Sequence, residues 1–568
     1  MERRWILEGD AGTDNSAISW ADICGLPCIA HLLMRKGFAS ADDVNAFLQP
    51  RLKSLGDPFL LPNMKLAVDR ILRALDLQER IVLFGDYDVD GVTSLALLAQ
   101  MLRSYGANPD LFLPLRMEEG YGLSSESISR CCDLYHPQLL IAVDCGTSSI
   151  AEIANLRERG VEVLVFDHHE PKSALPDCVA VVNPKIDEDS SAGYLCSVGI
   201  VFKLCHALLK TRPLTDFDLK QHLDLVALGT VADIVPLHGE NRVLVQRGAL
   251  QLAKSSRPGL RKLMEVAAVR APISPEDIGF RLGPRLNAAG RLHTAEKALR
   301  LLLTEDETEA TELAGALDVQ NRERQTVEKQ IFAAADEQVD REFDAQKHAA
   351  IVVGARDWHP GVLGIVASRI ARKYHRPTIV VGFDDAGMGK GSGRSIEGFS
   401  LVEALSRCSE WLEKFGGHEM AAGLTIAEKN FPAFTESFRR MARSMISDDQ
   451  LEPCLHIDHE LRFSELNYEF LRWHEMLQPF GSGNPQPVFF ASEVEPATEP
   501  RIVKEKHVLL RLRQRNHHQR AIFFDGALQP LPPAPWDIAF RIASDEYEGE
   551  TRLQMQLQAL RASAPIKC

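Results

Sequence analysis

The chain has 568 residues, of which 45% are hydrophobic and 25% charged, and its formal net charge is −15. This length exceeds what one hydrophobic core supports, so we expect several domains, and the apolar share excludes wholesale disorder. The start of the chain turns polar before any apolar stretch of secretory length, and no later segment has 18 uninterrupted apolar residues. We therefore expect a cytoplasmic protein that does not enter a membrane.

Neither the cysteines nor the overall charge defines a function. The 11 cysteines contain no CxxC pair and no disulfide framework, so we interpret them as ordinary thiols. An acidic chain is unfavourable for binding nucleic acid, because phosphates are bound by Lys and Arg. Net charge does not, however, exclude a local basic patch, and acidic residues gathered to hold cations would contribute to the deficit.

Three short apolar runs in the first half of the chain predict a parallel sheet. They occupy residues 81–84, 139–143 and 161–166 and are separated by helix-like stretches. This alternation is typical of a parallel sheet with helices on both faces. Each run ends directly in acidic or histidine residues, and ligands of such sheets bind at the carboxyl ends of the strands. We expect these polar groups to converge in space.

The segment FGDYDVDG at 84–91 carries the strongest chemical signal. If it stays extended, the alternating Asp86, Asp88 and Asp90 point to one side. Three like charges on one face repel unless cations or protons compensate, and hard divalent cations prefer carboxylate oxygen. A calcium loop of the EF-hand type is the alternative, but the downstream glutamate is missing at the required spacing.

Three later motifs add ligands of the same kind. AVDCGTS places Asp144 after a strand, FDHHEP supplies His168 and His169, and TVADIVPL presents Asp233 in a turn. Taken alone, each could be a cap, a loop residue or an ordinary histidine pair. Adjacent residues on an extended chain face opposite ways, so we expect one histidine to bind metal and the other to orient ligands or contact substrate. A mixed carboxylate and imidazole site suits Mn²⁺ as well as Mg²⁺.

The second half of the chain predicts a long helix, a second α/β unit and a small barrel. Residues 305–345 are rich in Glu, Ala, Gln and Arg, which favours a long charged helix. AIVVG at 350–354 and TIVVGF at 378–383 flank a helix, and Gly-rich turns are expected at 387–393 and 416–417. From about residue 453, short alternating strands with Pro and Gly turns predict a β-barrel.

A basic stretch lies within the expected barrel. Residues 501–520 hold seven Lys or Arg and one acid, and Arg511, Arg513 and Arg515 recur with a period of two, which places them on one strand face. This face is either simply solvated or follows the backbone of a single DNA strand. Phe523 and Phe524 either stack bases or belong to the core.

The order DxDxD, D, DHH, D resembles the four motifs of the DHH phosphoesterase superfamily. RLGPRLNAAGR (281–291), GKGSGRS (389–395), GGHEMAAG (416–423) and PFGSGNPQP (479–487) further resemble the RecJ family. The resemblance implies an α/β multidomain fold. Its expected parts are an N-terminal segment packing on the DHH domain (1–60), a parallel-sheet DHH domain (61–300), a connecting helix (301–347), an α/β DHHA1 domain (348–450) and an OB-like, single-stranded-DNA-binding β-barrel (451–568).

The resemblance also implies the roles of individual residues. Two divalent metal ions, Mg²⁺ or Mn²⁺, would be held by Asp88, Asp90, Asp144, His168 and Asp233, with Asp144 bridging them and with Asp86 and His169 adjacent or supporting. Substrate would be bound by Arg285, Asn287, Arg291, Ser392, Arg394, Ser395 and His418, and by Arg511, Arg513 and Arg515 of the barrel.

The function implied is a 5′-to-3′ exonuclease that hydrolyses single-stranded DNA to 5′-mononucleotides in DNA repair and recombination. We expect a monomer, with single-strand-binding protein as a partner. Two alternatives stay open. A DHH phosphodiesterase acting on small molecules or short oligonucleotides would generally lack the barrel, and a non-catalytic single-stranded DNA scaffold would have lost metal carboxylates, none of which is missing here.

Overall fold

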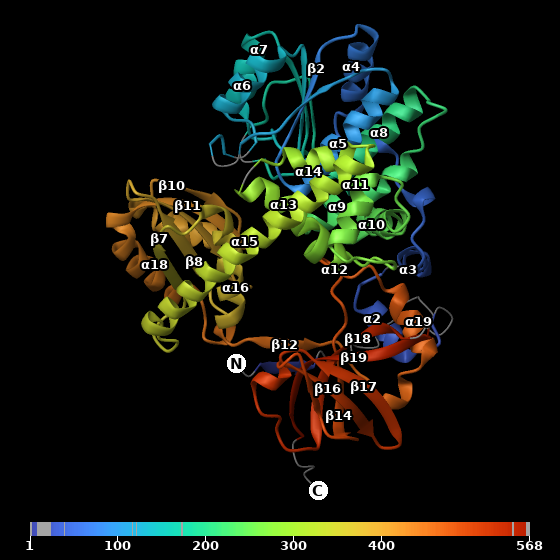
Figure 1. The fold of residues 1–568 in the computed structure, drawn as a ribbon, viewed down its shortest axis with the longest axis vertical. Coiled ribbons are helices and arrows are strands. Elements are labelled where there is room, and N and C mark those ends of the chain that lie inside the picture. The colour runs from blue at the N-terminus through green and yellow to red at the C-terminus, as the bar shows by residue number, and fades with distance from the viewer. Residues whose placement is uncertain are drawn as a thin grey trace. The chain divides into compact units, whose positions relative to one another are not determined.

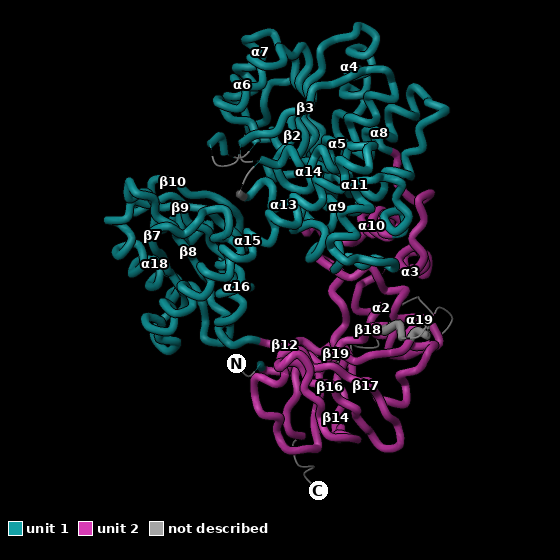
Figure 2. The backbone as a smooth tube through the Cα atoms, viewed as in Figure 1, with its two compact units in different colours: residues 1–3, 58–233, 250–453 teal, residues 4–57, 234–249, 454–568 magenta. Residues whose placement is uncertain are grey.

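The computed structural model describes residues 3–7, 24–38, 40–115, 118–120, 122–171, 174–292, 294–547 and 550–563. By contacts the chain divides into two compact units, shown in Figure 2 and described here one at a time. The first unit consists of residues 1–3, 58–233 and 250–453, and the second of residues 4–57, 234–249 and 454–568.

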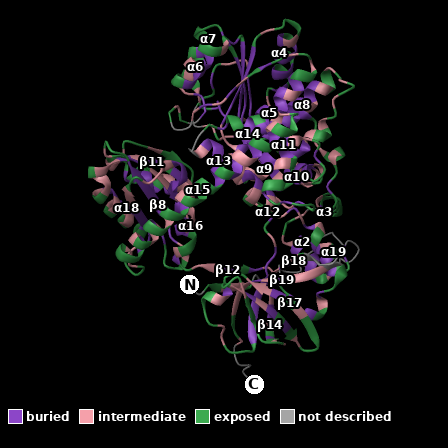
Figure 3. Ribbon diagram, in the orientation of Figure 1, coloured by how far each residue is buried: buried purple, intermediate pink, exposed green. Residues whose placement is uncertain are grey.

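A five-stranded parallel sheet forms the centre of the first α/β domain, as the apolar runs predict. Its strand order is β3-β2-β4-β5-β6, and all neighbouring strands run in the same direction. The strands are β2 (Ile81–Gly85), β3 (Asp110–Phe112), β4 (Leu139–Val143), β5 (Glu162–Phe166) and β6 (Ala180–Val182). Every residue of β2 and β4 is buried, because helices cover both faces of the sheet (Figure 3).

Figure 1 shows helices on both sides of this sheet. One face packs against α6 (Ser125–Tyr135) and α7 (Ile150–Glu158), which contribute Ile128, Ile153 and Leu156 to a core with Val82 and Phe84. Further helices of this part of the chain are α4 (Met64–Asp76), α5 (Val89–Ser104), α8 (Ser197–Thr211), α9 (Leu223–Ala232), α11 (Pro258–Val266), α12 (Pro275–Asp277), α13 (Gly283–Leu292) and α14 (Glu296–Leu303). A π-helical turn at Ile278–Leu282 precedes α13.

The predicted long helix is α15 (Glu307–Glu342), with 36 residues. It begins at Asp306, whose side chain accepts a hydrogen bond from the N–H of Glu309. Its first half contacts α11, α13 and α14, whereas Ile331, Ala335 and Val339 enter the core of the second α/β domain. The helix therefore connects two domains of one unit. None of the helices in the described ranges is long and apolar enough to cross a bilayer.

The second α/β domain contains a mixed sheet of order β10-β11-β9-β8-β7. Its elements are β7 (Ile351–Arg356), α16 (Leu363–Tyr374), β8 (Thr378–Phe383), β9 (Met388–Arg394), α17 (Leu401–Arg407), β10 (Lys414–Gly417), β11 (Ala421–Ala427) and α18 (Phe431–Met445). The expected Gly-rich turn at 387–393 is wrong, since most of it is strand β9. Glycine suits this strand because a Cβ at Gly391 would lie 2.7 Å from Leu424.

In the second unit, a closed five-stranded barrel confirms the expected OB-like fold. The closed order is β14-β18-β19-β17-β16, with β16 pairing back onto β14. Its strands are β14 (Phe489–Pro496), β16 (His507–Gln514), β17 (His517–Phe523), β18 (Trp536–Tyr547) and β19 (Glu550–Ala562). Shorter elements are β12 (Cys454–Ile457), β13 (His459–Glu460), α19 (Tyr468–Met476) and β15 (Arg501–Val503).

Most of residues 1–60, expected to pack on the DHH domain, belong to the second unit. Strand β1 (Arg4–Leu7) pairs with β12, and α2 (Pro27–Met34) and α3 (Ala41–Leu48) share a hydrophobic core with the barrel. Apolar side chains such as Ile29 and Leu33 are buried there against residues more than 400 positions later in the sequence, so no local pattern could place them. Residues 8–23 lie outside the described ranges.

Residues 234–249, expected within the DHH domain, also belong to the second unit. They include most of α10 (Gly239–Leu252). The guanidinium of Arg242 donates to the backbone oxygens of Phe47, Met476 and Leu477, and it lies over the Phe47 ring at 3.7 Å. One buried side chain thus ties three remote segments together.

Candidate metal centre

Acidic and histidine side chains gather at the carboxyl edge of the parallel sheet. β2 ends immediately before Asp86, β4 immediately before Asp144, and β5 immediately before Asp167 and the two histidines. Asp233 does not follow a strand of the sheet, because it is the C-cap residue of helix α9. α9 approaches closely at Gly229, where a Cβ would lie 3.0 Å from a carboxylate oxygen of Asp90.

The DxDxD segment does not stay extended, so the condition under which its three carboxylates would all point to one side is not met. Asp88 is the N-cap of α5, and its carboxylate accepts a hydrogen bond of 3.1 Å from the N–H of Gly91. Asp90 lies in the first helical turn. The chain turns because the unpaired N–H groups at the start of a helix favour an Asp cap. Gly91 is required, since a Cβ there would lie 2.4 Å from the Asp86 carbonyl oxygen.

Despite this turn, the predicted residues fall into three overlapping groups of potential metal ligands. In each group the ligand atoms lie within 4.8 Å of one another. The groups are Asp86 with Asp88 and Asp144, Asp90 with His168 and Asp233, and Asp144 with His168 and His169. Asp144 and His168 each belong to two groups. The structure therefore brings together all seven residues predicted around the metal.

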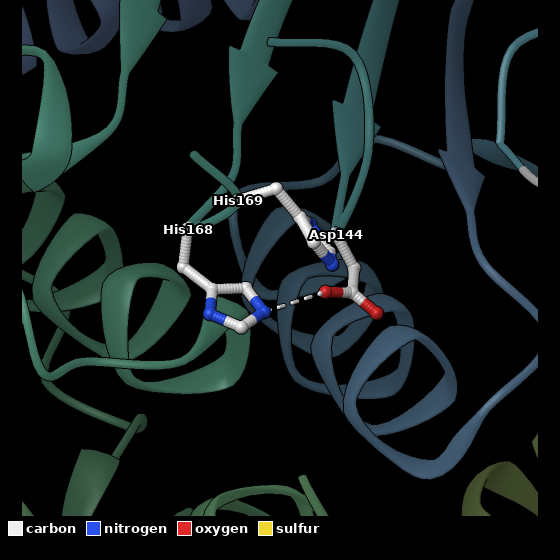
Figure 4. Close-up of side chains that lie close together, drawn as sticks. All are labelled: Asp144, His168 and His169. Atoms are coloured by element: carbon white, nitrogen blue, oxygen red, sulfur yellow. Dashed lines mark ion pairs between the residues drawn. The ribbon is translucent and has the colours of Figure 1, made fainter. Parts of the chain in front are cut away.

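Asp144 is held in an unusual backbone conformation. Its φ is 64°, in the left-handed region that most residues avoid but that Asp and Asn tolerate better than others. Its carboxylate is buried and accepts a hydrogen bond of 2.9 Å from the Ser197 hydroxyl. Figure 4 shows this carboxylate beside the imidazole of His168, with 3.4 Å between Oδ1 and Nε2.

The two histidines have different surroundings. Burial, together with the neighbouring charge of His169, lowers the pKa of His168 to about 3, so its imidazole is neutral. The approach of Nε2 to Asp144 is therefore not an ion pair. Burial also disfavours charge on His169, but the hydrogen bond to Asp167 outweighs it and raises the pKa of His169.

Asp167 orients this histidine pair, and we did not predict it as a site residue. Its carboxylate accepts from the Nδ1 of His169 at 2.7 Å and from the backbone N–H groups of His168 and Thr147 at 2.8 and 2.9 Å. Burial opposes charge on Asp167, but these hydrogen bonds keep its pKa below the ordinary value. The sequence motif DHH could have revealed this role of Asp167, because an aspartate that directly precedes two histidines can reach both of them.

The buried carboxylates repel one another. Burial, followed by the charge of Asp88, raises the pKa of Asp90 to about 7. Burial, followed by the charges of Asp90 and Asp88, raises that of Asp233 to about 9. The pKa of Asp144 is raised for the same reasons. Such a cluster needs protons or cations to be stable.

The three residues predicted from RLGPRLNAAGR each contact a different part of the chain. Arg285 forms an ion pair of 2.9 Å with Asp318 of α15. Asn287 accepts a hydrogen bond from the N–H of Val89, and Arg291 donates to the carbonyl oxygen of Gly361. Two of the three therefore bridge α13 to other helices, and one reaches the metal loop.

Of the four predicted residues of the second α/β domain, Ser392 and Arg394 lie on β9, Ser395 directly follows it, and His418 lies between β10 and β11. Arg394 donates to the Ser392 hydroxyl at 3.3 Å, and the Ser395 hydroxyl donates to the Phe399 carbonyl oxygen at 2.6 Å. His418 is exposed in the turn before β11, whose first residue pairs with Arg394. The Ser395 hydroxyl is thus bonded to the backbone of its own domain, whereas the side chains of Arg394 and Ser392 contact each other.

The barrel arginines only partly match the prediction. Arg511 and Arg513 are exposed on β16, but Arg515 lies in the following turn with a φ of 54°. Arg513 pairs with Glu495 of β14. Arg511 instead lies opposite Arg520 of β17, which the period-two pattern did not reveal.

Comparisons with known proteins agree with this geometry. Family models match at residues 80–230 (DHH family, N-terminal domain), 346–444 (DHHA1 domain) and 457–559 (RecJ OB domain). The single-stranded-DNA-specific exonuclease RecJ of Escherichia coli is 34% identical over 93% of this chain and 95% of its own length. The RecJ protein of Bacillus subtilis is 36% identical over 94% of this chain and 67% of its own length. The crystal structure of Thermus thermophilus RecJ in complex with Mn²⁺ superposes with a TM-score of 0.83 and 32% identity, covering 99% of this chain and 80% of that one.

The sheet, the ligand cluster and the matched domains define a hydrolase of the DHH superfamily. With relatives above 30% identity along nearly the whole chain, the protein belongs to the RecJ family.

Proposed function

We propose that the protein is a metal-dependent exonuclease that removes 5′-mononucleotides from the 5′ end of single-stranded DNA, in DNA repair and recombination. The observation that carries the proposal is the ligand cluster around Asp144, in a chain whose curated relatives are named single-stranded-DNA-specific exonucleases. The polarity comes from the family resemblance.

The donor set fits divalent cations. His168 Nε2 and Asp233 Oδ2 are buried, lie 3.5 Å apart, and have no hydrogen-bond partner among the described residues. A neutral imidazole and a carboxylate pointing at one place are ligands for Mn²⁺ or Mg²⁺, the ions present in two similar RecJ crystal structures. We propose two ions, one beside Asp86, Asp88 and Asp144, the other beside Asp90, His168 and Asp233, with Asp144 between them.

Bound Mg²⁺ or Mn²⁺ supplies a Lewis acid that withdraws charge from the scissile phosphate and promotes the ionisation of water. The reaction is a hydrolysis. Water oxygen forms a bond to phosphorus, the bond from phosphorus to the 3′ oxygen of the terminal nucleotide breaks, and that oxygen leaves as a hydroxyl. The protein contributes fixed carboxylates, a neutral His168 and a His169 oriented by Asp167, so no nucleophilic side chain is required.

Arg394 and Ser392 are our candidates for holding a substrate phosphate. A Cβ on Gly364, the second residue of α16, would lie 3.0 Å from both the Arg394 Nη2 and the Ser392 Oγ, so a larger residue there would crowd these two groups. The guanidinium therefore lies beside the first turn of α16, where free N–H groups favour anions. Burial lowers the pKa of Arg394, and none of the described acids forms an ion pair with it. A phosphate would supply the missing negative charge.

The barrel supplies a second contact to the DNA. Arg511 and Arg520 lie opposite each other on neighbouring strands, and neither forms an ion pair within the described part of the chain. Like charges in this position repel, and a bridging phosphate would relieve the repulsion. We propose that the DNA backbone passes here. A monomeric state, the cytoplasm and single-strand-binding protein as a partner are carried over as proposals from the family.

The test is degradation of single-stranded DNA labelled at either end, with Mn²⁺, Mg²⁺ or EDTA. We expect metal-dependent release of the 5′ label as a mononucleotide before the 3′ label. Initial release from the 3′ end would refute the polarity. Hydrolysis of dinucleotides alone would favour a short-oligonucleotide phosphodiesterase, and binding without hydrolysis would favour a scaffold.

A further inference from the structure

Helix α13 lies directly against the backbone of the aspartate loop. The N–H of Val89 donates to the Oδ1 of Asn287 at 3.2 Å, across 198 residues of sequence. One turn later, a Cβ on Gly290 would lie 2.8 Å from the carbonyl oxygen of Tyr87. Two successive points on one helix therefore fix the loop at Tyr87 and Val89.

The contacted residue lies between two proposed metal ligands. Val89 is the first residue of α5, preceded by Asp88 and followed by Asp90. The first N–H groups of a helix have no partner within the helix. Here the Asp88 carboxylate accepts from Gly91, and Asn287 accepts from Val89. Because a backbone N–H only donates, the atom facing it must be the carboxamide oxygen.

We infer that Asn287 is a positioning residue of the metal centre. It holds Val89, and through it the Cα positions of both neighbouring aspartates, rather than contacting substrate as the family resemblance implied. The inference deepens the proposed function and rests on the metal site proposed there. A neutral amide suits this place, since it accepts the hydrogen bond without adding another charge to the acidic cluster.

The test compares Asn287→Leu, which removes the acceptor, with Asn287→Asp, which keeps it. Asn155→Leu, an exposed substitution on α7 of the same domain, is the matched control. For each protein the Mn²⁺ midpoint is measured by thermal shift without DNA, and single-stranded DNA binding is measured in EDTA. We expect Asn287→Leu to raise the Mn²⁺ midpoint roughly 10-fold or more, the usual loss when a group that orients a ligand is removed.

Asn287→Asp should keep a midpoint at or below that of the unaltered protein, and the Asn155→Leu midpoint should not change. DNA affinity in EDTA should change by less than about 2-fold in all three, well below 1 kcal/mol. An unchanged Mn²⁺ midpoint in Asn287→Leu, or weaker DNA binding without a metal effect, would overturn the inference. If Asn287→Leu does not fold, Asn287→Ala serves in its place. The metal titration needs no substrate, so failure to cleave DNA would refute the proposed function without affecting this result.

Discussion

The backbone N–H of Ser197 donates a hydrogen bond of 2.7 Å to one carboxylate oxygen of Asp90, although 107 residues separate the two in sequence. The N–H of Val198 donates to the other oxygen at 2.8 Å. Both belong to the first turn of α8, where free N–H groups and the helix dipole stabilise an anion. Together with a hydrogen bond from the Cys196 side chain, these bonds counteract the burial and the Asp88 charge that raise the pKa of Asp90.

The two hydrogen bonds of Ser197 can be separated by mutation. Ser197→Ala removes the hydroxyl bond to Asp144 and keeps the N–H bond to Asp90, whereas Ser197→Pro removes both. Proline is well tolerated at the first position of a helix, and Cys196 already has the extended backbone that a following proline requires. We expect weaker Mn²⁺ binding in both, with the proline variant roughly 10-fold worse than the alanine variant. Equal midpoints by thermal shift would show that the N–H does not support the site.

Asp144→Asn should abolish cleavage while retaining DNA binding. Asparagine tolerates the positive φ at this position, so the variant tests the charge without the backbone strain that alanine would add. We expect a loss of roughly 100-fold or more in the cleavage rate and a smaller thermal stabilisation by Mn²⁺. Binding to single-stranded DNA in EDTA serves as the control. Substantial remaining cleavage would contradict the position of Asp144 between two ions.

The sequence predicted which residues form the site better than it predicted how they are arranged within it. Apolar runs ending in Asp144 and His168 imply a parallel sheet, and a parallel sheet brings their carboxyl ends to one edge, so convergence followed from pattern alone. The turn at Asp88 did not follow, because helix capping competes with extension and only the fold decides between them. Ser197 and Asn287 reach the site from remote helices, and nothing in their local sequence reveals those partners.

The same limit applies to the barrel. A period of two correctly placed Arg511 and Arg513 on one strand face, but it could not show that Glu495 pairs with Arg513 or that Arg520 lies beside Arg511. Cross-strand neighbours depend on register, which turns and bulges set.

Replacing Arg511 and Arg520 together by glutamine should weaken DNA binding and reduce its salt dependence. Each contact to a phosphate of single-stranded nucleic acid contributes a slope of about 0.7 in the plot of log affinity against log salt concentration. We expect the double variant to lose between about 0.7 and 1.4 units of slope. Arg513→Gln is the matched comparison, and its effect should be smaller because Glu495 already neutralises that guanidinium. An unchanged slope in the double variant would remove this face from the DNA path.

Finally, acid should destabilise the second unit through His474 of α19. This imidazole is 2% exposed and lies among the rings of Phe470, Phe480 and Phe489. Burial lowers its pKa from 6.5 to about 4, so between these two values the unfolded chain binds a proton that the folded chain does not. Stability is therefore retained above pH 6.5 and lost as the pH falls towards 4, by about 3 kcal/mol in all.

His474→Phe should remove this part of the acid sensitivity, because phenylalanine fits the aromatic cluster and takes up no proton. Urea unfolding midpoints measured from pH 7 to pH 4 should fall less steeply in His474→Phe than in the unaltered protein, whereas His517→Phe, at an exposed position in the barrel, should follow the unaltered protein. The comparison of the two variants is needed because His222, half-buried beside Arg257, also has a lowered pKa and adds its own acid sensitivity to all three proteins. Identical slopes for His474→Phe and His517→Phe would show that the His474 imidazole becomes protonated in the folded state without cost.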